Sequence, residues 1–478
     1  MPGVKTTHRD YEKMAPLWAR CRAVVAGQAA MHAKGEAYLP KLTGEERTEY
    51  TARLKRSDFF NATWRTIAGL TGMAMRKEPA RVLPALLEGY AEDITMSGVN
   101  LDALAEHIVE EVLEVGRIGL LVDHPTMPDG VAPITQDAAE KMGQRPFLTT
   151  YRAEAIRNWK FARVANRWSL VQVVLGEQAE VLKDEFTTEL VDRYRVLDLD
   201  EAGNYRQRVF EVIDGKDVLV EGPLYPTMNG KPLDYIPFGI IGRSGKGDAI
   251  DEPPLIDLVD SNVAHFQLNS DYRHGLHFTA LPTLFLAGMT DTDADGNSTP
   301  FYIGGSAAIT SPHPDAKGMF IEYTGQGLGA ISTALKELEQ RMAILGARMI
   351  ADETRQAETL GATQIKRVGE NSILARICIA TSEAIEWALE VMAQWSGATG
   401  EISYQISREF NPLGLSAQDL TAIFAGVQSG IISEQEAFDL LQRGDVIDGQ
   451  KDFETHQEEI GQQGPAMPAP PDPGQIAA

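Results

Sequence analysis

The clearest hydrophobic pattern of the chain lies in residues 328–349. Apolar side chains recur there at alternating steps of three and four, at Leu328, Ile331, Leu335, Leu338, Met342, Leu345 and Met349. This spacing predicts a helix with one narrow apolar stripe, which is typical of a helix that packs against another helix. After the stripe comes a polar segment that contains Asp352, Glu353, Thr354, Arg355 and Gln356. A second helical pattern then runs to Trp395, so we predict two long helices joined by a charged loop.

Helical spacing of apolar residues also dominates the first 115 residues. Thr43 is expected to cap one of these helices, because acidic residues follow it in the first turn. The apolar run 118–123 after Gly116 predicts a buried strand. The helices themselves are predicted over 1–35, from Thr43, over 61–75 and from Asn100.

The pattern changes to a period of two between residues 145 and 242, which predicts antiparallel strands. Helix returns over 255–278 and is followed by a β excursion over 281–324. Ser433 and Glu436 form a capping-box pattern at the start of a short helix. The Pro-rich end, residues 456–478, is predicted to be disordered. The fold class predicted from these patterns is α+β.

Composition and charge narrow the function classes. No apolar run approaches the ~18 residues of a membrane-spanning helix, so we expect neither a membrane partner nor a signal peptide. Two cysteines, Cys21 and Cys378, are too few for a disulfide framework. The net charge is −24 at pH 7. This charge argues against a protein that clamps nucleic acid through basic patches, but not against one that lets DNA slide past.

Three local patterns imitate ligand-binding motifs, and each is incomplete. Gly325, Gly327 and Ala330 resemble a dinucleotide turn, but no second strand ending in an acid follows about 20 residues later. The run from Asp291 through Asp293, Asp295, Gly296 and Asn297 imitates a calcium loop. Its position 12 is Tyr302 instead of Glu, so a hairpin tip is favoured.

The third pattern, Arg243–Gly247, lacks the Ser or Thr of a P-loop. His265, His274 and His277 share one helical segment, but no carboxylate completes a metal site with them. No nucleophile–base pattern is present either. We therefore expect no enzymatic activity, no cofactor, no metal and no catalytic residue.

Several segments taken together resemble the portal proteins of tailed bacteriophages, specifically the DUF4055 group of portals. No single motif among them is chemically diagnostic, and the resemblance rests on their common order along residues 10–450. The matching segments are 38–79, 93–98, 116–125, 156–159, 253–258, 282–284, 342–348 and 358–359.

The resemblance implies a portal-type fold with an α/β wing, a two-helix stem interrupted by a small clip, a long helix and a helical crown. The implied wing is 1–250, and the implied stem helices are 255–278 and 328–349. The implied clip is 279–327, with Asp293, Asp295, Gly296 and Asn297 at its hairpin tip. The remaining implied parts are a tunnel loop over 350–360, a long helix with its return to the wing over 361–411, and a crown over 412–455.

The resemblance also implies a function. Portal proteins form a ring, usually of twelve subunits, at one capsid vertex, through which double-stranded DNA is packaged and ejected. The implied partners are the terminase large subunit, a head-completion or adaptor protein, and the major capsid or scaffold protein. The implied location is the portal vertex of the virion, after assembly in the host cytoplasm.

The charge of the chain fits a DNA conduit in physical terms. Twelve copies at −24 each carry about −288, and like charge on a channel wall lets DNA slide. Asp352–Gln356 are the candidate loop residues that face the channel. Arg355, Lys366 and Arg367 are candidate weak phosphate contacts, with ordinary solvated or inter-subunit ion pairs as the alternative.

Two other functions remain open at this point. One is an acidic capsid scaffold or adaptor protein that never contacts DNA. The other is a nucleotide-dependent enzyme that uses the Gly325–Ala330 turn.

Overall fold

The computed structural model combines helices and sheets, which confirms the mixed helix-and-sheet class. The residues that it describes are 3–125, 142–164, 166–228, 230–243, 245–247, 250–279, 283–287, 314–321, 325–350, 372–408, 410, 417–428, 431–443, 446–447 and 451–462.

Seven helical segments precede the first large sheet. Gly27 lies between the first two helices. Its φ is 85°, a conformation that glycine adopts readily and that is strained for other residues. The cap predicted at Thr43 is wrong: Glu46 is the N-cap, and it forms a reciprocal capping box with Glu49. The segments are α1 (Arg9–Val25), α2 (Gln28–Lys34), η1 (Gly35–Ala37), α3 (Arg47–Arg56), α4 (Ala62–Ala74), α5 (Ala85–Ala91) and α6 (Leu101–Val115).

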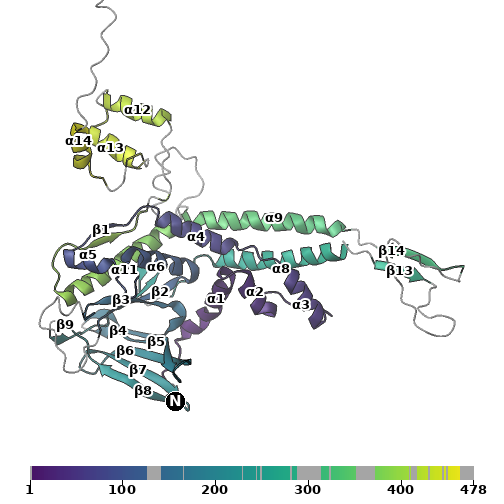
Figure 1. Cartoon of the computed structure of the whole chain (residues 1–478), viewed down its shortest axis with the longest axis horizontal. Helices are drawn as coiled ribbons and strands as arrows, with labels where there is room; N and C mark the ends of the chain where they lie inside the picture. Colours follow the sequence, from purple (N-terminus) through teal and green to yellow (C-terminus); the bar gives the residue numbers. More distant parts are fainter. Residues whose placement is uncertain are drawn as a thin grey trace, which may run out of the picture.

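Two antiparallel sheets form the β part of the body (Figure 1). The central sheet has the order β12-β11-β2-β3 and contains β2 (Arg117–Asp123), β3 (Phe147–Arg152), β11 (Phe238–Gly242) and β12 (Gly245–Lys246). After η2 (Ala153–Ala155), the chain forms a five-stranded meander of β4 (Ile156–Val164), β5 (Arg167–Leu182), β6 (Thr188–Leu199), β7 (Tyr205–Ile213) and β8 (Lys216–Leu224).

Short strand pairs complete the sheets. They are β1 (Ala80–Val82) with β15 (Ser403–Gln405), β9 (Thr227–Met228) with β10 (Lys231–Pro232), and β13 (Thr283–Ala287) with β14 (Lys317–Ile321).

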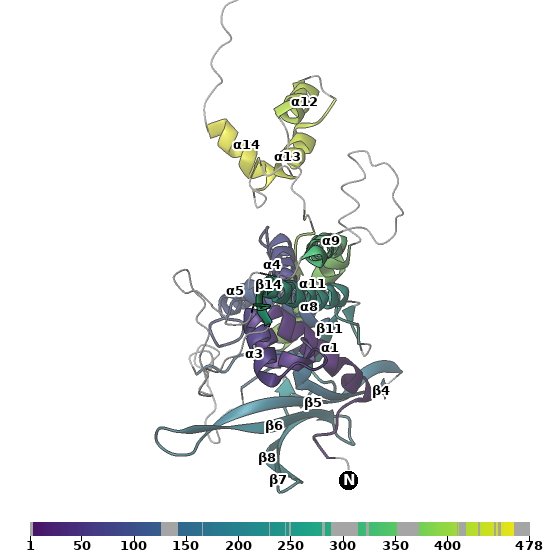
Figure 2. The same ribbon diagram turned by 90° about the vertical axis from the view of Figure 1, so that its right-hand side faces the viewer.

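The central sheet divides the apolar core in two. Ile118, Leu120 and Val122 of β2 pack with α4, α6 and the long helix α11 (Ile373–Ser396). Leu121 of the same strand points the other way, into a core formed by α1, β5 and β11. Successive residues of a strand face opposite sides, so one strand contributes to both cores. Figure 2 shows the meander on the side away from α11.

Helices α8 (Ile256–Thr279) and α9 (Gln326–Ala347) lie side by side and extend away from the body, with the β13–β14 ribbon at their far end (Figure 1). A 3-10 turn, η3 (Arg348–Ile350), follows α9. Helix α11 begins at Ile373, because Ser372 is an extended N-cap that accepts a hydrogen bond from the Ala375 N–H; residues 361–371 of the predicted long helix lie outside the described residues.

The C-terminal helices are α12 (Ala417–Gln428), α13 (Glu434–Arg443) and α14 (Phe453–Gln462). The predicted capping box is present, since Ser433 and Glu436 each accept a hydrogen bond from the other's backbone N–H. The prediction of disorder from residue 456 is wrong up to Gln462. Asp452 caps α14, and Phe453 packs on Phe438 with the ring centroids 5.4 Å apart.

Candidate assembly site: the α8–α9 helix pair

The apolar stripe starts at the seam between α9 and α8 and continues into the core of the body, where Met342 and Met349 pack. Leu335, Met342 and Met349 are buried, and the other four stripe residues are half-buried. Gly275 of α8 lies opposite Leu328, and a Cβ built on this glycine would be 2.7 Å from the Leu328 Cδ2. The absence of a side chain at Gly275 therefore lets the two helices approach closely near their far end.

The side of α8 that faces α3 and α4 is held by hydrogen bonds. The buried Asn262 accepts bonds from the backbone N–H and the hydroxyl of Thr63, at 3.1 and 3.0 Å, and donates one to the Phe60 carbonyl at 2.7 Å. Further along α8, Ser270 accepts bonds from Ser57 and Arg53. The buried side chains of Asn262 and Ser270 thus have partners, which avoids the cost of leaving them unsatisfied.

Arg53 also forms a buried ion pair, in which its Nε lies 2.7 Å from Glu45. Its hydrogen bond lowers the pKa of Glu45 to about 2. The same bond raises the pKa of Arg53. The ion pair therefore joins α3 to the segment just before it, while the hydrogen bonds of Ser57 and Arg53 to Ser270 hold α3 against α8.

The three histidines of α8 do not form a metal site. The buried His265 approaches Glu339 of α9 at 3.4 Å, and burial lowers the pKa of His274. His277 lies 3.5 Å from a guanidinium nitrogen of Arg56. Among the described residues, no group of His, Cys, Asp and Glu could hold a metal ion.

A groove opens on the side of the helix pair, with a volume of about 460 Å³. Ile344, a large apolar residue in the last turn of α9, is 56% exposed there. The groove is lined by Asp257, Glu337, Gln340, Arg341, Ile344, Leu345 and Arg348. Ala330, Ala343 and Ala347 are also exposed on α9, so much of the surface of this helix is small or apolar.

Several predicted functional residues lie outside the described residues. They are Asp352, Glu353, Thr354, Arg355, Gln356, Lys366, Arg367, Asp293, Asp295, Gly296 and Asn297. Their roles stay predictions.

The Gly325 turn lacks the surroundings of a dinucleotide site. Gly325 is the N-cap of α9 with a φ of 64°, and its carbonyl accepts a hydrogen bond from the Leu328 N–H. The preceding strand, β14, pairs antiparallel with β13 in a two-stranded ribbon. A dinucleotide fold places this turn in a parallel sheet, so the glycines here serve the entry into the helix.

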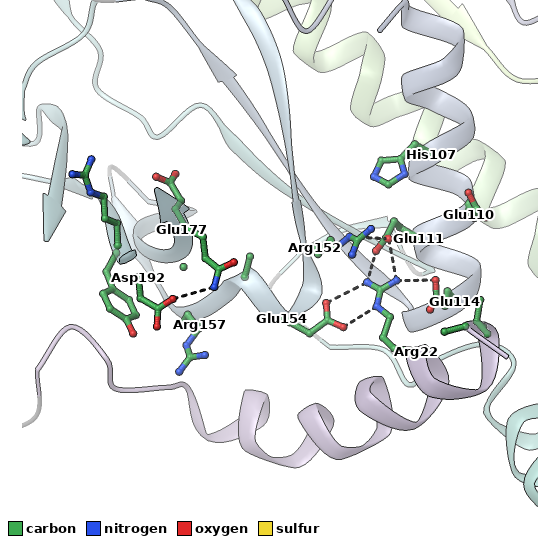
Figure 3. A pocket seen from close by; sticks show the side chains of 17 residues that line it. Arg22, His107, Glu110, Glu111, Glu114, Arg152, Glu154, Arg157, Glu177 and Asp192 are labelled. Carbon is green, nitrogen blue, oxygen red and sulfur yellow. Dashed lines mark hydrogen bonds and ion pairs between the residues drawn. The ribbon is translucent and has the colours of Figure 1, made fainter. Parts of the chain in front are cut away.

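A cavity of about 800 Å³ lies between α1, α6 and the meander (Figure 3). Arg22 extends into it and bonds to Glu111, Glu114 and Glu154, at 2.6, 2.7 and 2.9 Å. Burial raises the pKa of Glu114. Burial alone would raise the pKa of Glu154, but the hydrogen bond to Arg22 and the nearby positive charges together lower it.

Arg22 of α1 thus pairs with carboxylates from α6 and from η2. The resulting ion-pair cluster joins these three elements and is structural. Sequence reasoning missed this cluster. The only local signal was the three-residue spacing of Glu111 and Glu114 on one helix face.

None of the helices in the described part of the chain is long and apolar enough to cross a membrane.

Comparisons with known proteins give a family for one segment. No curated protein matches the chain. The structure is similar to "Neck of empty GTA particle computed with C6 symmetry", with 13% identity, a TM-score of 0.39, and coverage of 87% of this chain and 98% of that chain. It is also similar to "Virion of native gene transfer agent (GTA) particle", with 13% identity, a TM-score of 0.38 and the same coverages.

The family match lies in the candidate assembly site. Residues 254–396 match "Domain of unknown function (DUF4055)". The matched segment begins just before α8 and ends with α11, so it contains the whole helix pair and its ribbon. Over this segment the chain is thus similar to the family that its sequence resembles.

Proposed function

We propose that this protein is the portal subunit of a tailed bacteriophage or phage-like particle. In this proposal, copies of the chain form a ring at one capsid vertex. The ring does not recognise a DNA sequence and has no enzymatic activity. The ring conducts double-stranded DNA during packaging and ejection. It also docks the terminase large subunit, a head-completion or adaptor protein, and the capsid or scaffold protein.

One observation carries the proposal: the segment that matches DUF4055 contains two long helices that leave the body together and end in a β ribbon. This order supports α8 and α9 as the stem of a portal and β13–β14 as part of its clip. The body up to residue 250 is then the wing, and α12–α14 belong to the crown.

The surface of α9 supports assembly. A helix surface that faces only solvent would be expected to carry mainly polar residues. Helix α9 instead exposes Ile344 in the groove, and it also exposes Ala330, Ala343 and Ala347. In a ring, such a surface is covered by the neighbouring subunit.

The charge of the chain supports a channel in which DNA is not held. A net charge of −24 per copy repels phosphate wherever it faces the lumen. We place Asp352–Gln356 in a loop that faces the DNA, with Arg355, Lys366 and Arg367 as weak phosphate contacts. The same charge also fits an acidic scaffold or adaptor protein that never contacts DNA, which is the second candidate.

Electron microscopy of the purified protein tests the proposal. We expect rings with a central opening wide enough for a DNA duplex. Protein that stays monomeric at high concentration and under capsid-assembly conditions would overturn it. A second comparison uses particles assembled without this protein. If they package DNA as well as particles that contain its rings, the scaffold or adaptor function is favoured.

Deletion of residues 351–357 tests the role of the loop. We expect the rings to form as before, while packaging or retention of DNA is impaired. Loss of ring assembly in this variant would show that the segment holds subunits together.

A further inference from the structure

We propose that neighbouring copies of this chain join by inserting Phe60 and Trp64 of one copy into the α9 groove of the next. This inference rests on the proposed ring, and it names the two surfaces that would close it. The surfaces differ from one another and lie on opposite flanks of the helix pair.

The inserted surface is an aromatic pair at the start of α4. Trp64 is 49% exposed and Phe60 is 38% exposed. The Arg65 guanidinium lies 4.9 Å from the centre of the Phe60 ring, and the His265 ring lies 5.8 Å from it. The Asn61 side chain caps the helix by accepting a hydrogen bond from the Trp64 N–H. The pair is therefore exposed but held in place, as in residues that anchor protein interfaces.

The exposed face of α4 continues with small residues. Ala68, Gly69 and Gly72 follow Trp64 on this face, and all three are exposed. A Cβ built on Gly69 or Gly72 would meet nothing within 4 Å, so no packing within the chain requires glycine there. Each glycine inside a helix costs about 1 kcal/mol relative to alanine. Another subunit that packs closely against Gly69 and Gly72 would explain why glycine is present there despite this cost.

The receiving surface is the groove of about 460 Å³ beside α9. Ile344 and Leu345 provide its apolar part, and this suits aromatic rings. Asp257 and Glu337 line the same groove and are exposed. Arg341 and Arg348 line the groove as well, so its two acids and two bases balance. The groove therefore matches the α4 surface through its apolar part, and Asp257 or Glu337 would be the partner of Arg65 beside the two rings.

The two surfaces face opposite ways. Helix α4 lies against α9 at Gly346, where a Cβ would be 3.0 Å from the Thr66 Cγ2. Figure 2, which looks along the helix pair, shows α4 on one side of α9. Arg341 in the groove is five residues from Gly346, which places it roughly 140° around the helix axis at about 100° per residue.

This arrangement selects the kind of assembly. A surface on one flank that fits a different surface on the other flank makes a head-to-tail contact, which generates rings or filaments. A two-fold dimer instead requires one surface that pairs with itself. A second copy of the chain is thus the occupant that the positions of both surfaces favour.

Cysteine cross-linking tests the contact. The two natural cysteines, Cys21 and Cys378, are fully buried and do not compete. The double variant Trp64→Cys, Ile344→Cys is expected to form inter-subunit disulfides under mild oxidation and to give a ladder of covalent oligomers. A mixture of the two single variants is expected to stop at covalent dimers. Either single variant alone is expected to stay uncross-linked.

Substitutions provide a second measurement. Trp64→Glu and Ile344→Asp are each expected to shift assembly to at least tenfold higher protein concentration, as measured by light scattering. Phe186→Glu is the matched control, because Phe186 is 88% exposed but lies at the far tip of the β5–β6 hairpin. It is expected to leave assembly unchanged. Circular dichroism establishes that each variant is folded.

The outcomes separate this inference from the proposed function. Wild-type rings without a 64–344 cross-link would overturn the inference and leave the portal proposal standing. Cross-linking of either single variant with itself would overturn it in favour of a two-fold contact. Absence of wild-type rings under all assembly conditions would overturn the proposed function itself.

Discussion

Arg117 is a buried cation that the fold leaves without a hydrogen-bond partner. It is the first residue of β2, is 1% exposed, and its three side-chain nitrogens have no hydrogen-bond acceptor among the described residues. Its guanidinium lies 4.0 Å from the centre of the Trp159 ring. Burial lowers the pKa of Arg117 to about 9. We predict that Arg117→Met stabilises the protein.

The size of the effect follows from two opposing contributions. The lowered pKa corresponds to at most about 5 kcal/mol of destabilisation by the buried charge, at about 1.4 kcal/mol per pKa unit. Methionine would lose the cation–π contact with Trp159, which is worth up to about 2 kcal/mol. It would keep much of the side-chain volume. We therefore expect the free energy of unfolding to rise by roughly 1–3 kcal/mol, within the range seen for replaced buried ions.

Urea unfolding at pH 7 measures this change. Arg117→Lys is the matched control, because it keeps the charge and loses the flat guanidinium, and it should be no more stable than the wild type. Arg163→Met, on an exposed part of β4, should change stability by less than about 0.5 kcal/mol. Destabilisation of Arg117→Met by 2 kcal/mol or more, on the order of a lost buried hydrogen bond, would refute the reasoning.

The pH dependence has a definite sign. Below pH 9 Arg117 is charged in the folded and the unfolded chain, so its penalty is complete. From about pH 9 up to the ordinary pKa of arginine, the unfolded chain binds the additional proton, and the penalty shrinks as pH rises. The advantage of Arg117→Met should therefore decrease when unfolding is measured above pH 9.

Two further predictions concern the helix pair. Glu45→Gln should lower the free energy of unfolding by about 3 kcal/mol at pH 7, because it leaves the Arg53 charge buried and unpaired. Since the folded pKa of Glu45 is about 2 and its ordinary value is 4.5, the difference from wild type should vanish as pH falls through this window. Leu335→Ala should cost about 2–4 kcal/mol, whereas the exposed Lys336→Ala should cost little; equal effects in thermal unfolding would contradict the seam.

Local patterns along the chain were enough to predict several elements. Asn100 and Gly116 begin and end α6 as an N-cap and a left-handed C-cap, and both residue types act through their own backbone geometry. The stripe of α9 was readable because a helix buries residues at a fixed period. Such features depend only on neighbours within about one or two turns.

Contacts between distant segments could not be predicted in this way. Arg22 meets Glu154 across 132 residues, and Asn262 meets Thr63 across 199. Nothing near either residue indicates its partner, since many surface positions carry the same side chains. The start of α14 was missed for a related reason: Asp452 is an ordinary cap, but the helix also depends on Phe453 packing against Phe438.

The hydrogen bonds of α8 define how this helix can move. Asn262 and Ser270 are eight residues apart, or about 12 Å along the axis at 1.5 Å per residue. Apolar contacts tolerate small displacements, but these directional bonds do not, and a slip of one turn or a rotation by one residue would break both at once. Helix α8 is thus held at two points along its length. A force applied at its β13–β14 end is therefore transmitted to α3 and α4 as a tilt of the whole helix.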